Sequence, residues 1–336
     1  MSEKLSIAVD VMGGDYGPRI TLPACINQLK KNPHLTLYLV GDQSVFGPYT
    51  ETLSTALKSR LHIVPTTSVV SMEDKPSFAL RHRRESSMFK ALELVKNNQA
   101  SACVSGGNTG ALMALGCHVL GRLSGIDRPA IISAIPTNKS HAYLLDLGAN
   151  VNCSADQLLQ FALMGSAMVS AVEGNSSPRT ALLNIGIEDI KGNDQVRQAA
   201  SLIQAQQQLN YVGFIEGDEV FNGRAEVVVC DGFTGNIALK SNEGLARLIA
   251  GKLKQSFNRN LYRRILGLLA QPVLKELQQQ IDPGRRNGAS LLGLQGIVIK
   301  SHGSASSRHF EAAIEQAILD SKLNIPARIA EKLIHQ

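Results

Sequence analysis

Aromatic residues are scarce in this chain of 336 residues: they make up 4% of the sequence, and tryptophan is absent. This scarcity argues against modules that bind nucleic acid by stacking its bases on aromatic side chains. Cysteine is also rare, and the absence of a Cys-x-x-Cys pair argues against a zinc site or a disulfide framework. We expect the thiols to be small buried hydrophobic groups in a reducing cytosol. They are Cys25, Cys103, Cys117, Cys153 and Cys230.

Long apolar runs are missing as well. No stretch approaches the ~20 apolar residues that a transmembrane helix needs. The first apolar run extends only from Leu5 to Val9 and ends at Asp10, which favours a first β-strand over a signal peptide. We therefore expect a cytoplasmic protein, one that can still contact a membrane surface from inside the cell.

Three common catalytic signatures are also absent. The chain has no Gly-x-x-x-x-Gly-Lys-[Ser/Thr] and no Gly-x-Gly-x-x-Gly, which argues against a P-loop nucleotide site and a standard dinucleotide site. It has no Gly-x-Ser-x-Gly nucleophile elbow either. Without a strong candidate for a covalent acyl-enzyme, the sequence favours direct transfer between bound substrates.

Positive charge is in excess. The formal net charge is +6 and the isoelectric point is about 9.1. A basic balance favours acidic partners, which include nucleic acid, an anionic membrane surface and an acidic protein. The net charge alone does not distinguish among these three classes of partner.

Short β-rich runs alternate with helical patterns along most of the chain. Their strands are apolar throughout, which indicates burial on both faces and hence a mostly parallel sheet between two helix layers. The predicted strands are 5–11, 35–40, 60–64, 102–105, 130–135, 142–147, 180–185, 211–215, 226–230 and 296–300. The predicted fold is a Rossmann-like α/β/α sandwich, a single catalytic domain over 1–336. A helical hairpin is inserted at about 244–288 and closes with the turn-rich segment 282–288.

Glycine follows four of these predicted strands, and the loops contain most of our candidate substrate-binding residues. Glycine lets backbone N–H groups turn toward a bound anion, and a following helix adds its positive N-terminal end. Because ligands of open α/β sheets bind beyond the carboxyl ends of strands, we expect the four loops to form a phosphate pocket at one edge. A tight turn is the alternative explanation for each loop taken alone. The candidates are Asp10, Gly13, Gly14, Asn108, Thr109, Gly110, Asp231, Gly232, His302 and Gly303.

Two further polar residues are the candidate catalytic groups. Lys191 follows a strand end near a glycine, where its ammonium could bind phosphate or a developing oxyanion. Asn236 lies at the start of the helix after Asp231-Gly232, where its amide could donate into the pocket. The alternatives are a solvated lysine at a helix start and an N-cap asparagine.

These motifs, in this order, resemble the phosphate acyltransferase (PlsX) family over essentially the whole chain. The matching segments are Asp10–Asp15, Lys75–Ser77, Ser86–Met88, Asn108–Leu112, Leu145–Asn150, Leu183–Gly186, Lys191–Gly192, Asp231–Asn236, Leu239–Lys240, Asn287–Gly293 and Ser301–Gly303. The resemblance implies a homodimer that is related in fold to phosphotransacetylases and needs no cofactor, whether nucleotide or metal. It implies that inorganic phosphate attacks the thioester of a fatty acyl group on acyl carrier protein, giving acyl phosphate for phospholipid synthesis. Phosphotransacetylation from acyl-CoA and a non-catalytic membrane scaffold are the alternatives.

The predicted insertion contains a basic and an apolar set of residues. We expect Arg259, Arg263 and Arg264 to dock the acidic acyl carrier protein, because complementary charge steers encounter. Apolar residues recur there at three- and four-residue spacing, as in a helix lying on anionic lipid, beside the downstream membrane acyltransferase. They include Leu261, Ile265, Leu266 and Leu269. Packing in a dimer interface or in the protein's own core is the alternative.

Overall fold

A computed structural model describes residues 5–281 and 287–334, with no side-chain description for residues 278–281. Its strands are β1 (Leu5–Asp10), β2 (Leu35–Gly41), β3 (Leu61–Pro65), β4 (Ala102–Ser105), β5 (Ala130–Pro136), β6 (His141–Leu145), β7 (Arg179–Leu183), β8 (Asn210–Ile215), β9 (Val227–Val229), β10 (Ala289–Leu292) and β11 (Ile297–Lys300). Its α-helices are α1 (Pro18–Lys31), α2 (Gly47–Thr50), α3 (Thr55–Lys58), α4 (Pro76–His82), α5 (Ser87–Lys96), α6 (Thr109–Val119), α7 (Ala155–Glu173), α8 (Asp194–Gln204), α9 (Gly232–Phe257), α10 (Leu261–Leu269), α11 (Gln271–Ile281), α12 (Ser307–Leu323) and α13 (Ile325–Ile334).

One sheet contains all eleven of these strands, in the order β3-β2-β1-β4-β11-β10-β5-β6-β9-β7-β8. The first five strands of that order are parallel to one another and form the first block. The last four are also parallel to one another and form the second block. Between the blocks, β10 and β5 make three antiparallel junctions. Three reversals mean that the two blocks run in opposite directions.

Helices bury both faces of the sheet, as the apolar strands predict. In β1, Ile7 and Val9 belong to a core shared with α1 and α12, whereas Ala8 belongs to a core shared with α5 and α6. This alternation follows from the two-residue period of a strand. In the second block, α7, α8 and α13 cover one face. The predicted α/β/α architecture with a mostly parallel sheet is confirmed.

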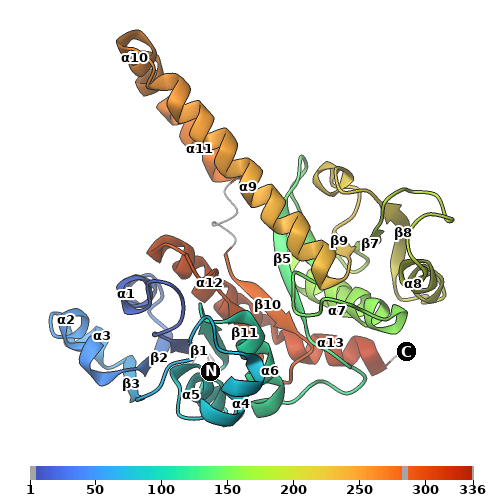
Figure 1. The fold of residues 1–336 in the computed structure, drawn as a ribbon. Helices are drawn as coiled ribbons and strands as arrows, with labels where there is room; N and C mark the ends of the chain where they lie inside the picture. Colours follow the sequence, from blue (N-terminus) through green and yellow to red (C-terminus); the bar gives the residue numbers. More distant parts are fainter. Residues whose placement is uncertain (1–4, 282–286, 335–336) are drawn as a thin grey trace.

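Helices α9, α10 and α11 form an arm, residues 232–281. In Figure 1, α9 projects from the α/β body and carries α10 at its far end. The arm begins at Gly232, twelve residues before the predicted insertion, because α9 continues without a break from the end of the second block. Of the predicted closing turn, residues 282–286 lie outside the described part of the chain. None of the described helices is long and apolar enough to span a membrane.

Candidate active site

Three of the predicted glycine loops meet at one edge of the sheet. They follow β1, β4 and β11, and we call residues 10–17, 105–110 and 300–304 the glycine-loop cluster. The Asp15 N–H donates to the Gly303 carbonyl (2.9 Å), and the Ser301 N–H donates to the Ser105 carbonyl (2.9 Å). The cluster therefore joins Asp10, Gly13, Gly14, Asn108, Thr109, Gly110, His302 and Gly303 of the predicted site.

Glycine is required at Gly13 and Gly14 because the loops approach so closely. A Cβ atom on Gly13 would lie 2.6 Å from an Asp10 carboxylate oxygen and 2.8 Å from the Gly107 nitrogen. Gly14 has a φ of 93°, and a Cβ there would lie 2.9 Å from the Gly303 carbonyl oxygen. All three contacts are shorter than non-bonded atoms allow, so a side chain at either position would force the loops apart.

Asp10 lies at the base of the cluster and is fully buried. Ser105 Oγ donates to its Oδ2 atom (2.7 Å), and the Gly107 N–H donates in turn to Ser105 Oγ (3.1 Å). Burial raises the pKa of Asp10, an effect that its hydrogen bonds oppose.

Lys300 ends β11 beneath the same loops. Its ammonium donates to the Gly106 carbonyl oxygen (3.2 Å) and to the Ser301 carbonyl oxygen. Burial lowers the pKa of Lys300 to about 8, while the negative charges of Asp10 and Asp15 act in the opposite direction. The buried Lys300 ammonium thus links the loop after β4 to the loop after β11.

Asn108 connects the cluster to its surroundings. Its side-chain oxygen accepts from the Ala111 N–H (3.0 Å) and caps α6, so Thr109 and Gly110 form the first turn of that helix. Its amide nitrogen donates to the carbonyls of Met72 (2.7 Å) and Asp74 (3.1 Å). Because both amide hydrogens are used within the chain, the hydrogen bonds of Asn108 give it a structural part in the cluster.

The fourth predicted loop lies elsewhere. Asp231 and Gly232 follow β9, which runs opposite to β1, β4 and β11, so the expectation that all four loops share one edge is wrong. The Asp231 carboxylate accepts from the N–H (2.7 Å) and hydroxyl (3.1 Å) of Thr234 and is the N-cap of α9. The Gly232 N–H donates to the Asn150 carbonyl (2.8 Å). These contacts fix where α9 starts.

Lys191 lies at this second edge, in the loop that follows β7. Its side chain is exposed, and its backbone is held by Glu188 and by Asn184, whose amide donates to the Lys191 carbonyl (3.2 Å). The strands before Lys191 and Asp231 are adjacent in the sheet. Among the described residues, no hydrogen bond or ion pair joins Lys191 to Asn236 or to the glycine-loop cluster.

A side chain of α9, which begins at the second edge, contacts the glycine-loop cluster at the first edge. Asn236 is not its N-cap, since it lies in the second turn; a Cβ on Gly148 would touch its side chain at 3.4 Å. Lys240 and Glu243 follow at four- and seven-residue spacing, so the three polar residues share one helix face. On this α9 face, the Lys240 ammonium lies 2.9 Å from His302 Nε2 and 3.0 Å from the Glu243 carboxylate. The second block thereby contacts the glycine-loop cluster through a side chain.

Both ring nitrogens of His302 have partners. An ammonium has only donors, so Nε2 accepts from Lys240, while Nδ1 lies 2.9 Å from Ser304 Oγ and 3.2 Å from the Ser304 backbone nitrogen. Burial lowers the pKa of His302, and the positive charge of Lys240 lowers it further. Both effects favour the neutral form of the imidazole beside the Lys240 ammonium.

Comparison with known proteins shows the family of this chain. The chain matches the family model described as "Fatty acid synthesis protein" over residues 5–328. It is 55% identical to the phosphate acyltransferase of Pseudomonas savastanoi pv. phaseolicola over 327 residues, which cover 97% of this chain and 96% of the relative. It is 49% identical to the phosphate acyltransferase of Shewanella sediminis over 330 residues, 98% of this chain and 96% of the relative. The chain belongs to the phosphate acyltransferase family. It is an enzyme of that type, and the reaction of the family is acyl transfer to phosphate.

Solved structures with the same fold agree with the architecture of this phosphate acyltransferase. A phosphotransacetylase from Streptococcus pyogenes superimposes with a TM-score of 0.63 at 18% identity, covering 96% of this chain and 95% of that one. The EutD phosphotransacetylase from Staphylococcus aureus gives a TM-score of 0.60 at 17% identity, covering 96% and 94%. At these identities the likeness concerns the fold alone.

The arm is strongly exposed and carries a net positive charge. Arg259, Arg263 and Arg264 are exposed, and so are Leu261 (75%), Ile265, Leu266 and Leu269 (73%). Packing of these apolar residues in the chain's own core is thus excluded. Residues 232–281 contain eight lysines and arginines but only two glutamates, a formal charge of +6 that equals that of the whole chain. The rest of the chain is formally neutral.

Sequence reasoning missed two lysines of this site, Lys240 and Lys300. The signal for Lys240 was its four-residue spacing from Asn236 on a predicted helix, which places the two side chains on one face. For Lys300, the signal was a lysine that ends an otherwise apolar strand directly before Ser301-His302-Gly303. The five cysteines are all unpaired; Cys25, Cys103 and Cys230 are buried, whereas the other two are partly exposed.

Proposed function

We propose that this chain transfers a fatty acyl group from acyl carrier protein to inorganic phosphate, giving acyl phosphate and free acyl carrier protein for phospholipid synthesis. Membership of the phosphate acyltransferase family supports the reaction type. The structural observation that supports the proposal is the contact between Lys240 of α9 and His302 of the glycine-loop cluster. It brings the Lys240 ammonium, one helical turn from Asn236, against loops in which we expect an anion to bind.

The proposed chemistry needs no covalent enzyme intermediate. A phosphate oxygen attacks the thioester carbonyl carbon, a C–O bond forms, and the C–S bond breaks with departure of the phosphopantetheine thiolate. The developing charge is on the carbonyl oxygen, and donors preorganised toward such an oxyanion contribute about 3–4 kcal/mol each. Asn236 and Lys191 are the residues that we assign to this stabilisation. Asp10 and Asp231 organise loops, through Ser105 and Thr234 respectively.

The proposed partners follow from the arm. The exposed Arg259, Arg263 and Arg264 would dock acyl carrier protein, which is acidic. The exposed Leu261, Ile265, Leu266 and Leu269 would contact an anionic membrane, holding the enzyme peripherally at the inner face of the cell membrane. There its amphiphilic product would pass to a membrane acyltransferase. A homodimer would cover the apolar residues that α9 exposes nearer the body, Leu245, Leu248, Ile249 and Leu253.

The test is detection of the product. The purified protein is incubated with a long-chain acyl carrier protein and phosphate, and acyl phosphate is measured by mass spectrometry with and without hydroxylamine trapping. Acyl-CoA replaces acyl carrier protein in a parallel reaction. We expect phosphate-dependent product from acyl carrier protein and a kcat about 10²–10³ lower in Asn236→Ala. Product from acyl-CoA alone would refute the proposed donor, and no product from either would refute the activity.

A further inference from the structure

Lys240 has a free donor at the junction of the two blocks. An ammonium has three N–H groups. One donates to His302 Nε2 (2.9 Å) and one to Glu243 (3.0 Å), and the third has no partner among the described residues. The side chain of Lys240 is 47% exposed, whereas that of Glu243 is 14% exposed. The cation is therefore held in place on one side and open to solvent on the other.

Lys300 and Lys191 are less well placed than Lys240 to bind an anion at the glycine-loop cluster. Lys300 is buried, and its ammonium already donates to two backbone carbonyls that it ties together. Lys191 has no described hydrogen bond or ion pair with the cluster. Lys240 is near enough to Lys300 and His302 for its charge to lower the pKa of both. Lys240 and Lys300 thus place two cations near the cluster, which favours the arrival of an anion, while the negative charges of Asp10, Asp15 and Glu243 offset part of this attraction.

The α9 face gives this cation a fixed position. Lys240 lies one helical turn from Asn236, and Glu243 lies one turn further on the same face. His302 belongs to the glycine-loop cluster, in which the Gly303 carbonyl is bonded to Asp15 beside Gly14. An anion bound between the Lys240 ammonium and these loops would therefore touch both blocks, close to the helix face that carries Asn236.

We propose that Lys240 binds the phosphate substrate, with its ammonium held in position by His302 and Glu243. The inference rests on the proposed function, in which phosphate is the acyl acceptor. Glu243 has a second effect, since its negative charge opposes the approach of phosphate to the ammonium that it holds. Lys240 is thus a substrate-contacting residue, and Glu243 and His302 are positioning residues.

Steady-state kinetics of Lys240→Ala tests the assignment. Loss of one hydrogen bond to a charged group should raise the KM for phosphate roughly 10- to 100-fold while leaving the KM for the acyl donor within about twofold. Lys240→Arg keeps the charge and should recover part of the loss. Lys254→Ala is the matched control, since Lys254 lies on α9 about 21 Å further along the arm at 1.5 Å per residue. Its KM for phosphate should match that of the unmodified chain.

Glu243→Gln distinguishes phosphate binding from a purely structural bridge. If Lys240 binds phosphate, removal of the neighbouring negative charge should lower the KM for phosphate by about two- to fivefold, opposite in sign to Lys240→Ala. If the bridge only holds the blocks together, both variants should lose thermal stability and raise both KM values. An unchanged phosphate KM in Lys240→Ala, or a rise in Glu243→Gln, would overturn the inference.

A binding measurement separates this inference from the proposed activity. Inorganic phosphate should raise the melting temperature of the unmodified chain, and the rise should be lost in Lys240→Ala but kept in Lys254→Ala. If no acyl phosphate forms but this pattern holds, the proposed activity fails and the phosphate site stands. If acyl phosphate forms and Lys240→Ala keeps the full phosphate-dependent rise, the activity stands and the phosphate site fails.

Discussion

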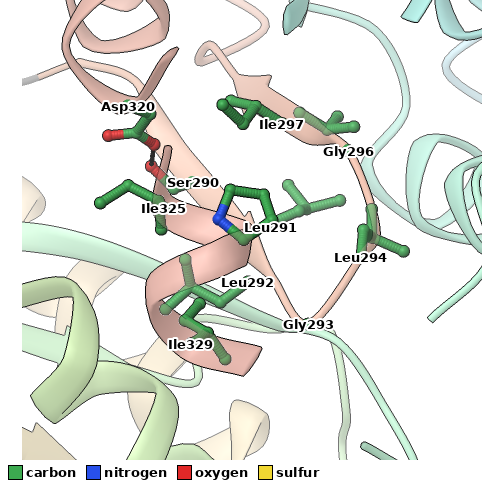
Figure 2. Close-up of a pocket in the computed structure, with 12 residues that line it drawn as sticks. Ser290, Leu291, Leu292, Gly293, Leu294, Gly296, Ile297, Asp320, Ile325 and Ile329 are labelled. Atoms are coloured by element: carbon green, nitrogen blue, oxygen red, sulfur yellow. Dashed lines mark hydrogen bonds between the residues drawn. The ribbon is translucent and has the colours of Figure 1, made fainter. Parts of the chain in front are cut away.

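Replacing Asp320 by asparagine should make the protein more stable at alkaline pH. Asp320 is on α12 and is buried beside a mainly apolar pocket lined by residues of β10 and α13 (Figure 2). Its carboxylate accepts from Ser290 Oγ (2.7 Å) and from the Gln316 amide (2.7 Å). Burial raises the pKa of Asp320 to about 6, although both hydrogen bonds lower it.

The sign and size of the effect follow from linkage. The ordinary pKa of 3.8 applies in the unfolded chain, so the folded state holds the Asp320 proton more tightly. This contribution to stability is present in full below pH 3.8 and is lost as the pH rises through 6. One pKa unit corresponds to about 1.4 kcal/mol, so the free energy of unfolding should fall by about 3 kcal/mol between pH 4 and pH 8 from this group.

Asparagine resembles the protonated carboxyl group in shape and charge. Asp320→Asn should therefore match the unmodified chain near pH 4 and exceed its free energy of unfolding by up to about 3 kcal/mol at pH 8. For a chain of this length that is a rise of about 4 °C in melting temperature. Thermal unfolding followed by circular dichroism at both pH values measures it.

Asp218→Asn is the matched control, because Asp218 is an exposed aspartate. If Asp320→Asn is no more stable than the unmodified chain at pH 8, or is equally stabilised at pH 4 and pH 8, the reasoning from burial is refuted.

Three further predictions concern the proposed site and partners. Lys191→Ala should lower kcat by about 10²–10³ without unfolding the chain, because one oxyanion donor is lost; an unchanged kcat would remove Lys191 from the mechanism. Reversing Arg263 and Arg264 to glutamate should raise the KM for acyl carrier protein and spare kcat, and a KM that stays constant and insensitive to salt would place docking elsewhere. Leu266→Glu combined with Leu269→Glu should abolish cosedimentation with anionic liposomes while activity and dimer mass persist. Persistent cosedimentation would contradict membrane contact, and a monomeric or precipitating variant would show that these leucines are structural.

The sheet could be predicted from the sequence almost strand by strand. All ten predicted strands are present, because strands covered by helices on both faces are mainly apolar. The strand that was missed is β10, whose four residues Ala289–Leu292 lie between Gly288 and Gly293. A strand this short, between two glycines and next to a predicted turn, has no pattern of its own that separates it from a loop.

Missing β10 had a consequence for the predicted site. It forms two of the three antiparallel junctions, and the direction of a strand leaves no trace in its composition. The glycine loops were therefore recognised as loops, but Asp231 and Gly232 were assigned to the wrong edge. A glycine loop can be predicted from the few residues that form it. Which loops lie together depends on the order and direction of the strands, and these are set by the whole fold.

The long-range contact between Lys240 and His302 could not be predicted either. Sixty-two residues separate them along the chain, and the contact exists because α9 begins at the end of the second block and passes the first. The predictions for Arg259, Arg263, Arg264 and the arm leucines needed only helical spacing. The structure shows that these side chains are exposed, and their partners remain to be tested.

The separation of charge between the arm and the rest of the chain gives the molecule a large permanent electric dipole moment. Helix α9 alone is about 39 Å long at 1.5 Å per residue, several times the Debye length of about 8 Å at physiological ionic strength. An anionic surface therefore exerts a torque as well as an attraction, and it turns the enzyme so that the tip of the arm arrives first. The effect of salt on such an encounter should therefore depend on the number of cations on the arm, and not on the net charge of the whole protein.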